Sequence, residues 1–372
     1  MVRRPSRRAR IGQWFLLAGL VVVGWYFAAN AVGNLSERHV PFGFGYLGNT
    51  ANFDIPFHLI DFAPSDTYGR ALVVCVLNTL LVSAMGIVAA TLIGLFVGIM
   101  RLSANWLVRN LALGFIELIR NTPILVQIVF WYVAVLQTLP GPRQSIVLPA
   151  GVLLNIRGIY LPVPMFAADR LYWVWFAVAL VLATPLAWRL TLARRPVRGK
   201  ALLLLLPALG CLAAGIEQFD MPALHGFNIT GGVQLPPELA ALWAGLSIYS
   251  AAFIAEIVRS TIEAVSRGQR EAALSLGLKP RQVLFLVVLP QALRMMVPPM
   301  TSQYLNLIKS SSLGAAVAYP EIFQIFAGTV LNQSGRETET FAIVMAIFLA
   351  INLPVSAAMN WYNRRIALRV AQ

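Results

Sequence analysis

Long apolar stretches alternate with short polar stretches along the whole chain. About 20 apolar residues in a helix cross the hydrocarbon core of a bilayer. We therefore predict an all-α polytopic membrane protein with about eight transmembrane helices, at residues 11–31, 71–100, 111–139, 171–188, 201–216, 239–260, 292–312 and 341–362. The stretch 201–216 is short for a crossing and requires flanking side chains that reach the interface.

Composition agrees with this pattern, and charge gives it an orientation. The 372 residues are 58% hydrophobic and 12% charged, and the net charge is +14. Such a charge indicates nucleic-acid binding in a soluble protein, but here the basic residues cluster in alternate loops, so we expect no nucleic-acid partner. By the positive-inside rule these loops and both termini are cytoplasmic. The basic clusters are Arg3, Arg4, Arg7, Arg8 and Arg10; Arg101 and Arg109; Arg189, Arg194, Arg195, Arg198 and Lys200; Arg267, Arg270, Lys279 and Arg281; and Arg364, Arg365 and Arg369.

The first apolar stretch has two interpretations. Its basic start and the sequence Ala29-Asn30-Ala31 resemble a cleavable signal peptide. Its length of about 20 residues exceeds that of a signal core and suits a span, which favours an uncleaved helix.

The predicted spans divide the chain into four parts. Residues 1–69 form a transmembrane helix and a periplasmic loop, and 70–139 form the first part of a helical core. Residues 140–238 are an insertion with two added helices, and 239–372 form the second part of the core. We expect an irregular outer loop at 144–169, an acidic outer loop at 217–238, and an outer loop with a surface helix at 313–340.

Small residues recur every fourth position in the second predicted span. Gly86, Ala90, Gly94 and Gly98 therefore share one helix face. Such a face lets a neighbouring helix approach closely.

Motifs of enzymes and nucleotide-binding proteins are missing from the sequence. A phosphate-binding loop has Gly-Lys followed by Ser or Thr, with another glycine five residues before that Gly. Gly199-Lys200 is followed by Ala201 and lacks the earlier glycine. His39, His58 and His225 fall in predicted outer loops, and Cys75 and Cys211 fall in apolar runs. We expect no catalytic residue, no metal site and no cofactor in this chain.

The longest polar passage between two spans carries a helix, a corner and a second helix. Glu271, Ala272 and Ala273 begin the first helix, which places the carboxylate of Glu271 at a helix start, where it suits the dipole. Gly277 ends this helix in a left-handed cap, and Pro280 opens the next. Basic residues surround the corner, so we expect it in the cytoplasm, either as an ordinary loop helix or as a docking surface.

Two motifs give this chain a resemblance to a known family. Glu271-Ala272-Ala273, Gly277 and Leu289-Pro290 resemble the EAA motif of permease subunits of bacterial ABC importers, with Val287 where that family usually has isoleucine. The run Glu117, Arg120, Thr122, Pro123, Val126 and Gln127 resembles the signature of permeases for polar amino acids, and Asn78-Thr79-Leu80, Glu256, Arg259 and Gly268-Gln269 agree with it. The resemblance covers about 70–135 and 240–365, and the front extension with the central insertion is similar to permeases for general L-amino acids.

This resemblance implies a type I ABC-importer permease core in the bacterial inner membrane and a non-catalytic subunit that imports L-amino acids. The loop 268–290 is then the coupling loop, seated on a dimer of a separate ATPase that binds ATP and Mg. A periplasmic amino-acid-binding protein and a second homologous permease chain are the other implied partners, and we expect a heterodimer.

Polar residues inside the predicted spans are candidates for structure, gating or substrate contact. Charged groups are expensive in a membrane, by about 2.5 kcal/mol or more, so Glu117 with Arg120, and Glu256 with Arg259, are expected to form ion pairs or to face the bundle interior. Thr122 and Pro123 are expected to bend their helix. Polar groups near the midplane form a tentative substrate path of Asn78, Gln127, Ser250, Gln303, Asn306, Lys309 and Ser310.

A secondary transporter or channel that uses an ion gradient is the alternative function. Such proteins often contain an inverted repeat, and we find none in this sequence. The EAA loop also favours the ATP-driven permease.

Overall fold

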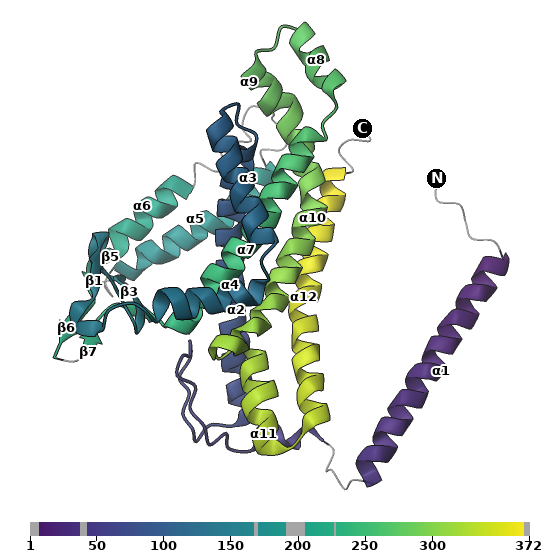
Figure 1. Cartoon of the computed structure of the whole chain (residues 1–372), viewed down its shortest axis with the longest axis vertical. Coiled ribbons are helices and arrows are strands. Elements are labelled where there is room, and N and C mark those ends of the chain that lie inside the picture. The colour runs from purple at the N-terminus through teal and green to yellow at the C-terminus, as the bar shows by residue number, and fades with distance from the viewer. Residues whose placement is uncertain (1–6, 38–42, 167–169, 191–204, 227, 368–372) are drawn as a thin grey trace. The chain divides into compact units, whose positions relative to one another are not determined.

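A computed structural model describes residues 7–37, 43–166, 170–190, 205–226 and 228–367. The basic residues Arg3, Arg4, Arg194, Arg195, Arg198, Lys200 and Arg369 and the histidine His39 lie outside the described residues. Helices dominate the fold (Figure 1). The α-helices are α1 (Arg7–Glu37), α2 (Tyr68–Arg101), α3 (Trp106–Arg120), α4 (Ile124–Val129), α5 (Leu171–Leu190), α6 (Leu205–Gly215), α7 (Pro237–Glu263), α8 (Arg267–Ser275), α9 (Pro280–Val283), α10 (Leu289–Ser310), α11 (Leu331–Ser334) and α12 (Glu337–Ala367).

The described residues also contain shorter 3-10 and π elements and eight strands. The 3-10 helices are η1 (Phe44–Gly48), η3 (Pro142–Gln144), η4 (Pro149–Gly151) and η10 (Ser311–Val317), and the π-helices are η2 (Phe130–Leu136), η9 (Leu284–Val288) and η11 (Phe323–Val330). The strands are β1 (Ile146–Leu148), β2 (Val152–Asn155), β3 (Gly158–Leu161), β4 (Val163–Phe166), β5 (Ile216–Asp220), β6 (Ala223–His225), β7 (Asn228–Thr230) and β8 (Val233–Leu235).

The predicted spans coincide with helices in the described chain. Helices at 68–101, 237–263, 280–317 and 337–363 are each long and apolar enough to cross a membrane, and α3 with α4 and η2 makes a fifth candidate that is bent by 103°. The other three predicted spans fall on α1, α5 and α6. The helical class is confirmed, and the number of crossings stays a prediction.

The described chain forms two compact units, which we call unit 1 and unit 2. Unit 1 comprises 1–81, 297–315 and 320–372, and unit 2 comprises 82–296 and 316–319, each as far as it is described. In unit 1 the loop before α2 and the start of α2 share an apolar core with η11 and α12. Tyr68 donates from its hydroxyl to Gln333 Oε1 at 3.0 Å, and the amide of Gly43 donates to Glu339 Oε1 at 2.9 Å. These two hydrogen bonds join the segment 43–68 to α11 and α12.

In unit 2 the expected small-residue face of α2 is confirmed as a close packing surface. A Cβ atom at Gly94 would lie 2.6 Å from Ile254 Cγ2, and one at Gly98 would lie 2.7 Å from Val258 Cβ, both on α7. The two helices therefore meet backbone to side chain at these positions, as glycine alone allows.

Antiparallel β-structure occurs where we expected an irregular outer loop at 144–169 and an acidic outer loop at 217–238. β1, β2, β3 and β8 form one sheet in that order, β4 pairs with β5, and β6 pairs with β7. β4 precedes α5 and β5 follows α6, so this ribbon continues the helix hairpin (Figure 1). The strands have three to five residues, which is too short for an alternating pattern to be recognised in sequence.

The segment 313–340 also differs from the expected outer loop with a surface helix. Its π-helix η11 is part of the core of unit 1, and Ile322, Ile325, Phe326 and Val330 are buried. Glu321 caps it: its carboxylate accepts from the amides of Phe323 at 2.8 Å and Gln324 at 2.6 Å. Apolar residues at every turn of η11 explain why it lies inside rather than on the surface.

Glu321 should make the stability of unit 1 depend on pH. Burial raises the pKa of this fully buried carboxyl to about 7. A raised pKa in the folded state stabilises below the unfolded pKa of about 4.3, and this contribution is lost as pH rises through 7. The difference in unfolding temperature between the neutral variant Glu321→Gln and the parent is therefore expected to shift by a few degrees in favour of the variant between pH 5 and pH 8.

Thermal unfolding of the purified chain at the two pH values measures this difference. Glu337→Gln, at an exposed position in the first turn of α12, is the matched control for the loss of a carboxylate elsewhere in unit 1. An equal gap between Glu321→Gln and the parent at pH 5 and pH 8 would show that Glu321 does not titrate in this range.

Candidate coupling and transport sites

The polar loop after α7 forms the helix, corner and helix that its sequence predicts, with one shift. The first helix, α8, begins at Arg267 and not at Glu271, because the Ser266 hydroxyl caps it by accepting from the amide of Gln269. Glu271 therefore lies in the second turn, and the expected place at a helix start is wrong. The signal for the true start is the serine three residues before Gln269.

Gly277 ends α8 as predicted. Its φ of +81° is left-handed, its amide donates to Leu274 O at 2.9 Å, and the amide of Leu278 donates to Ala273 O at 3.3 Å. This pair of hydrogen bonds is a Schellman motif. Pro280 then begins α9, and Gln282 Oε1 accepts from the amide of Lys279 at 2.9 Å. The backbone amides of Leu276, Gly277, Leu278 and Lys279 are thus all hydrogen-bonded at the corner.

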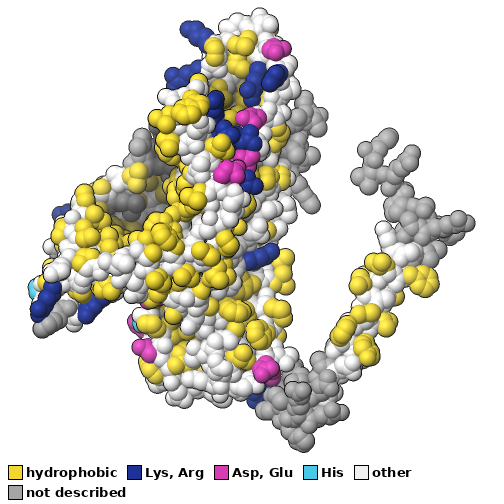
Figure 2. Space-filling model, in the orientation of Figure 1, with side chains coloured by type: hydrophobic (Ala, Val, Ile, Leu, Met, Phe, Trp, Pro, Cys, Tyr) yellow, Lys and Arg dark blue, Asp and Glu magenta, His cyan; other side chains and the backbone are white. Residues whose placement is uncertain are grey.

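Apolar side chains project from this corner into solvent. Leu276 is 83% exposed and Leu274 is 48% exposed, and Glu271 and Ala272 beside them are exposed too. Ala273 is buried and faces the chain itself. The two exposed leucines give the corner an apolar surface within a polar loop. Figure 2 shows many of the Lys and Arg side chains of unit 2 around the end that carries α8 and α9.

Leu289 and Pro290 begin α10, directly after the π-helix η9. Proline has no amide hydrogen and clashes with the carbonyl four residues earlier, which lies in η9. The wide turn of η9 accommodates this clash. The Leu-Pro pair therefore shapes the entry into the span.

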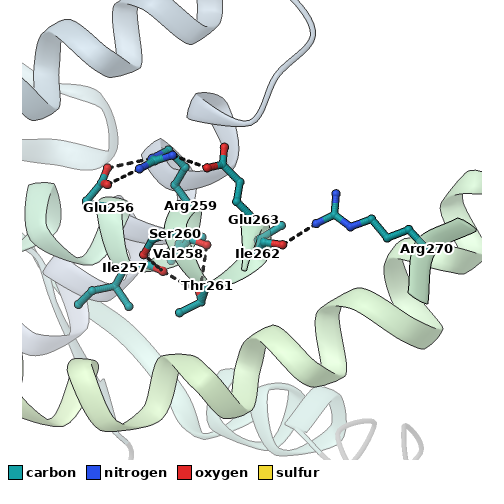
Figure 3. Close-up of polar contacts among 9 residues, drawn as sticks. All are labelled: Glu256, Ile257, Val258, Arg259, Ser260, Thr261, Ile262, Glu263 and Arg270. Atoms are coloured by element: carbon teal, nitrogen blue, oxygen red, sulfur yellow. Dashed lines mark hydrogen bonds and ion pairs between the residues drawn. The ribbon is translucent and has the colours of Figure 1, made fainter. Parts of the chain in front are cut away.

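Near the C-terminal end of α7 the predicted pair of Glu256 and Arg259 is confirmed (Figure 3). Arg259 Nη2 lies 2.5 Å from Glu256 Oε1, and Arg259 Nε lies 3.0 Å from Glu256 Oε2. Arg259 also binds Glu263, one turn further along. The two carboxylates and the guanidinium form one continuous chain of charge along α7.

Glu117 and Arg120 do not pair with each other in the described part of the chain. Glu117 Oε2 instead accepts from Asn121 Nδ2 at 3.2 Å. The Arg120 guanidinium lies 5.1 Å from the ring centre of Phe253 on α7, in cation–π geometry. Arg120 thus connects α3 to α7 and leaves Glu117 at the exposed surface.

The polar-amino-acid signature builds the sharp bend between α3 and α4. The Thr122 hydroxyl donates to Leu118 O at 2.8 Å, and Pro123 cannot continue the α3 hydrogen bonds. Gln127 then donates through Nε2 to Ile119 O at 2.9 Å and to Thr122 O at 3.1 Å. Both carbonyls lie at the bend, where Ile119 O also accepts from the amide of Thr122 at 3.4 Å. The expected bend at Thr122 and Pro123 is confirmed.

The seven tentative path residues are divided between the units. Gln127 and Ser250 lie in unit 2 and are buried. Asn78, in unit 1, is fully buried, and its Nδ2 donates to the carbonyls of Phe57 and Pro320, both at 2.9 Å. Asn306 and Lys309 are exposed on α10, while Gln303 and Ser310 are partly buried. Among the path residues of unit 1, those on α10 are therefore the accessible ones.

Fold and loop together define a multi-pass helical membrane protein with a rigid polar corner between two spans. A family model for the inner membrane component of binding-protein-dependent transport systems matches residues 221–368. A crystal structure of an amino acid ABC transporter with histidines has the same fold, with a TM-score of 0.51 and 20% identity, and the match covers 80% of this chain and 95% of that one.

Full-length relatives extend the match to the whole chain. The putative amino-acid ABC transporter permease protein YhdX of Escherichia coli (strain K12) is 47% identical over 98% of this chain and 95% of its own length. The general L-amino acid transport system permease protein AapQ of Rhizobium johnstonii is 42% identical over 98% and 93%. The glutamate/glutamine/aspartate/asparagine transport system permease protein BztB of Rhodobacter capsulatus is 38% identical over 95% and 91%. The chain belongs to the family of ABC-transporter permeases.

Membership in this family makes the chain a multi-pass membrane subunit that transports and does not itself catalyse. The expected ABC-importer permease core is confirmed by the family match and the shared fold. Relatives match along nearly the full chain, so the front extension and the insertion at 140–238 are features that they share.

Proposed function

We propose that this chain moves L-amino acids from the periplasm to the cytoplasm by alternating access, coupled to a separate ATPase through the loop 268–290. Relatives whose names specify amino-acid permeases support the substrate class. The single structural observation that carries the coupling role is the exposed apolar tip of α8, Leu274 and Leu276, held in place by the left-handed cap at Gly277. A rigid apolar tip fits a cleft in a partner protein.

The partners follow from this role. We propose that Glu271, Ala272, Gly277 and the exposed leucines contact an ATPase dimer that binds ATP and Mg, with Ala273, Leu289 and Pro290 supporting the loop from within. A periplasmic amino-acid-binding protein would deliver substrate, and a second, homologous permease chain would complete a heterodimer. The basic clusters at the two ends of the sequence support a cytoplasmic position for both termini of this bacterial inner-membrane protein.

For the substrate path we propose that Asn306 and Lys309 of α10 contact the amino acid, because they are exposed and lie three residues apart on one helix face. Gln303 and Ser310 flank them. Asn78 and Gln127 use their amide groups on backbone carbonyls, and Ser250 is buried, so these three shape the path rather than bind first. Glu117, Arg120, Glu256 and Arg259 hold the inner ends of the helices.

Uptake of labelled L-amino acids into proteoliposomes tests the function. The vesicles hold the whole complex, with ATP supplied on the side of the coupling loop and the binding protein on the other. Uptake is expected only when ATP, Mg and the binding protein are all present. Uptake that follows an ion gradient without ATP would overturn the proposal and establish the secondary-transporter alternative.

A further inference from the structure

α8 is fastened to both neighbouring spans by side-chain hydrogen bonds. Arg270 Nη2 lies 2.5 Å from Ile262 O, which belongs to the last turn of α7 (Figure 3). Carbonyls in the last turn of a helix have no donor further along that helix. A guanidinium that donates to such a carbonyl therefore satisfies it and connects α8 to the end of α7.

The next connection leads to α10. Gln291 Nε2 lies 2.5 Å from Gln269 Oε1 and 2.9 Å from Val287 O. Gln291 is in the first turn of α10 and Val287 is in the π-helix before it. One amide group thus joins α8, η9 and α10.

These two connections leave α8 little freedom. Gln269 and Arg270 are consecutive on the helix, so their side chains diverge by about 100° and hold α8 from two directions. Ser266 fixes its start and Gly277 its end. A short helix held at four points moves as one body with the ends of its neighbours.

We infer that Arg270 and the pair Gln269–Gln291 are positioning residues, which make α8 move together with the inner ends of α7 and α10. This inference rests on the proposed function, in which the ATPase displaces α8. The connections then convert one displacement into a joint movement of two spans. Without them α8 would tilt on its loops, and ATP would be hydrolysed with little movement of the spans.

Two readouts test the inference in the whole complex: amino acid imported per ATP hydrolysed, and hydrogen exchange of the amides in 266–276. Arg270→Met keeps the length of the side chain and removes the donor. It is expected to lower the import ratio at least fivefold, to keep ATP hydrolysis within about twofold, and to speed exchange in α8. Arg270→Lys, which still donates, should recover most of the ratio.

Arg267→Met is the matched control. Arg267 is exposed three residues earlier on α8, and its side chain forms no hydrogen bond to the described residues. This variant should leave both readouts unchanged. Equal import ratios in Arg267→Met and Arg270→Met would overturn the role of Arg270.

A charge exchange tests the glutamine pair. The double variant Gln269→Glu with Gln291→Glu places two like charges together and should lower the import ratio at least fivefold. Gln269→Glu with Gln291→Lys replaces the hydrogen bond by an ion pair and should restore it. An ion-pair variant no better than the repulsive one would overturn the inference.

Hydrogen exchange separates the failure of this inference from the failure of the proposed function. If exchange in α8 responds as described while the parent complex shows no ATP-driven uptake, the connections exist and the proposed function is wrong. If uptake in the parent is ATP-driven while Arg270→Met changes neither readout, the inference is wrong and the function stands.

Discussion

Replacing Gly277 with aspartate is expected to leave membrane insertion intact while ATP-driven uptake falls at least about tenfold, which corresponds to about 1.4 kcal/mol. The φ of +81° at this position costs an L-residue about 1–2 kcal/mol, although aspartate is among the side chains that tolerate it. The space around Gly277 is open within 4 Å, so the chain itself accepts the side chain. The expected loss of uptake therefore comes from the effect of the new carboxylate on the ATPase that is proposed to cover the corner.

Gly277→Asn separates charge from backbone strain. Asparagine also tolerates the left-handed conformation and matches aspartate in size, but it is neutral. Uptake into proteoliposomes and ATPase co-purification are measured for both variants. The docking role predicts uptake within a few-fold of the parent for asparagine and a much larger loss for aspartate. Normal assembly and normal uptake in Gly277→Asp would refute docking at this corner.

Gly94→Leu is expected to prevent unit 2 from folding. Even a Cβ atom at Gly94 would lie 2.6 Å from Ile254 Cγ2 and 2.9 Å from Ala251 O, and the backbone oxygen cannot rotate away. Overpacking costs about 1–3 kcal/mol per site or more, and leucine adds three further carbons to the clash. The expected result is a loss of most of the folded, detergent-extractable protein, measured as the monodisperse fraction after purification.

Gly114 on α3 offers the matched control. A Cβ at Gly114 would meet nothing within 4 Å, so Gly114→Leu should leave the yield of folded protein unchanged. Ile254→Ala in the Gly94→Ala background should recover part of the loss caused by Gly94→Ala alone, because it removes the clash with Ile254 Cγ2 at 2.6 Å and leaves those with the Cβ of residue 254 at 2.7 Å and with Ala251 O at 2.9 Å. Equal yields for leucine at 94 and 114 would contradict the close packing of α2 on α7.

Local chemistry made the coupling loop predictable. Glycine at a left-handed cap and proline at a first helical turn act within a few residues, and Gly277 and Pro280 have these conformations in the structure. The Glu-Ala-Ala run consists of good helix formers and predicts a start of α8 one turn too late. The true start is set by Ser266, whose hydroxyl makes the cap. The apolar spans were predictable because lipid imposes length and hydropathy on each helix separately.

Long-range packing was not predictable in the same way. The strands of the insertion depend on pairings such as β3 with β8, which lie about seventy residues apart in sequence and are too short to show a pattern. An ion pair of Arg120 with Glu117 is expected from their spacing of three residues on α3, but the Arg120 guanidinium lies over the ring of Phe253 on α7 instead. Spacing within one helix does not identify a contact with another helix. Gln127 is expected on the substrate path, and only the bend of the backbone shows that its amide nitrogen donates to the two carbonyls of Ile119 and Thr122.

The order of synthesis has a consequence for unit 1, because its core combines the beginning and the end of the chain. The Thr79 hydroxyl accepts from the amide of Ile322, 243 residues later. At about 5–20 residues per second, roughly 12–50 s separate the two on the ribosome. During that interval the core residues around Cys75 have been synthesised, but their packing partners Ile322 and Phe326 have not. A chain that stops before residue 320 therefore lacks Ile322 and Phe326 and cannot complete the core of unit 1.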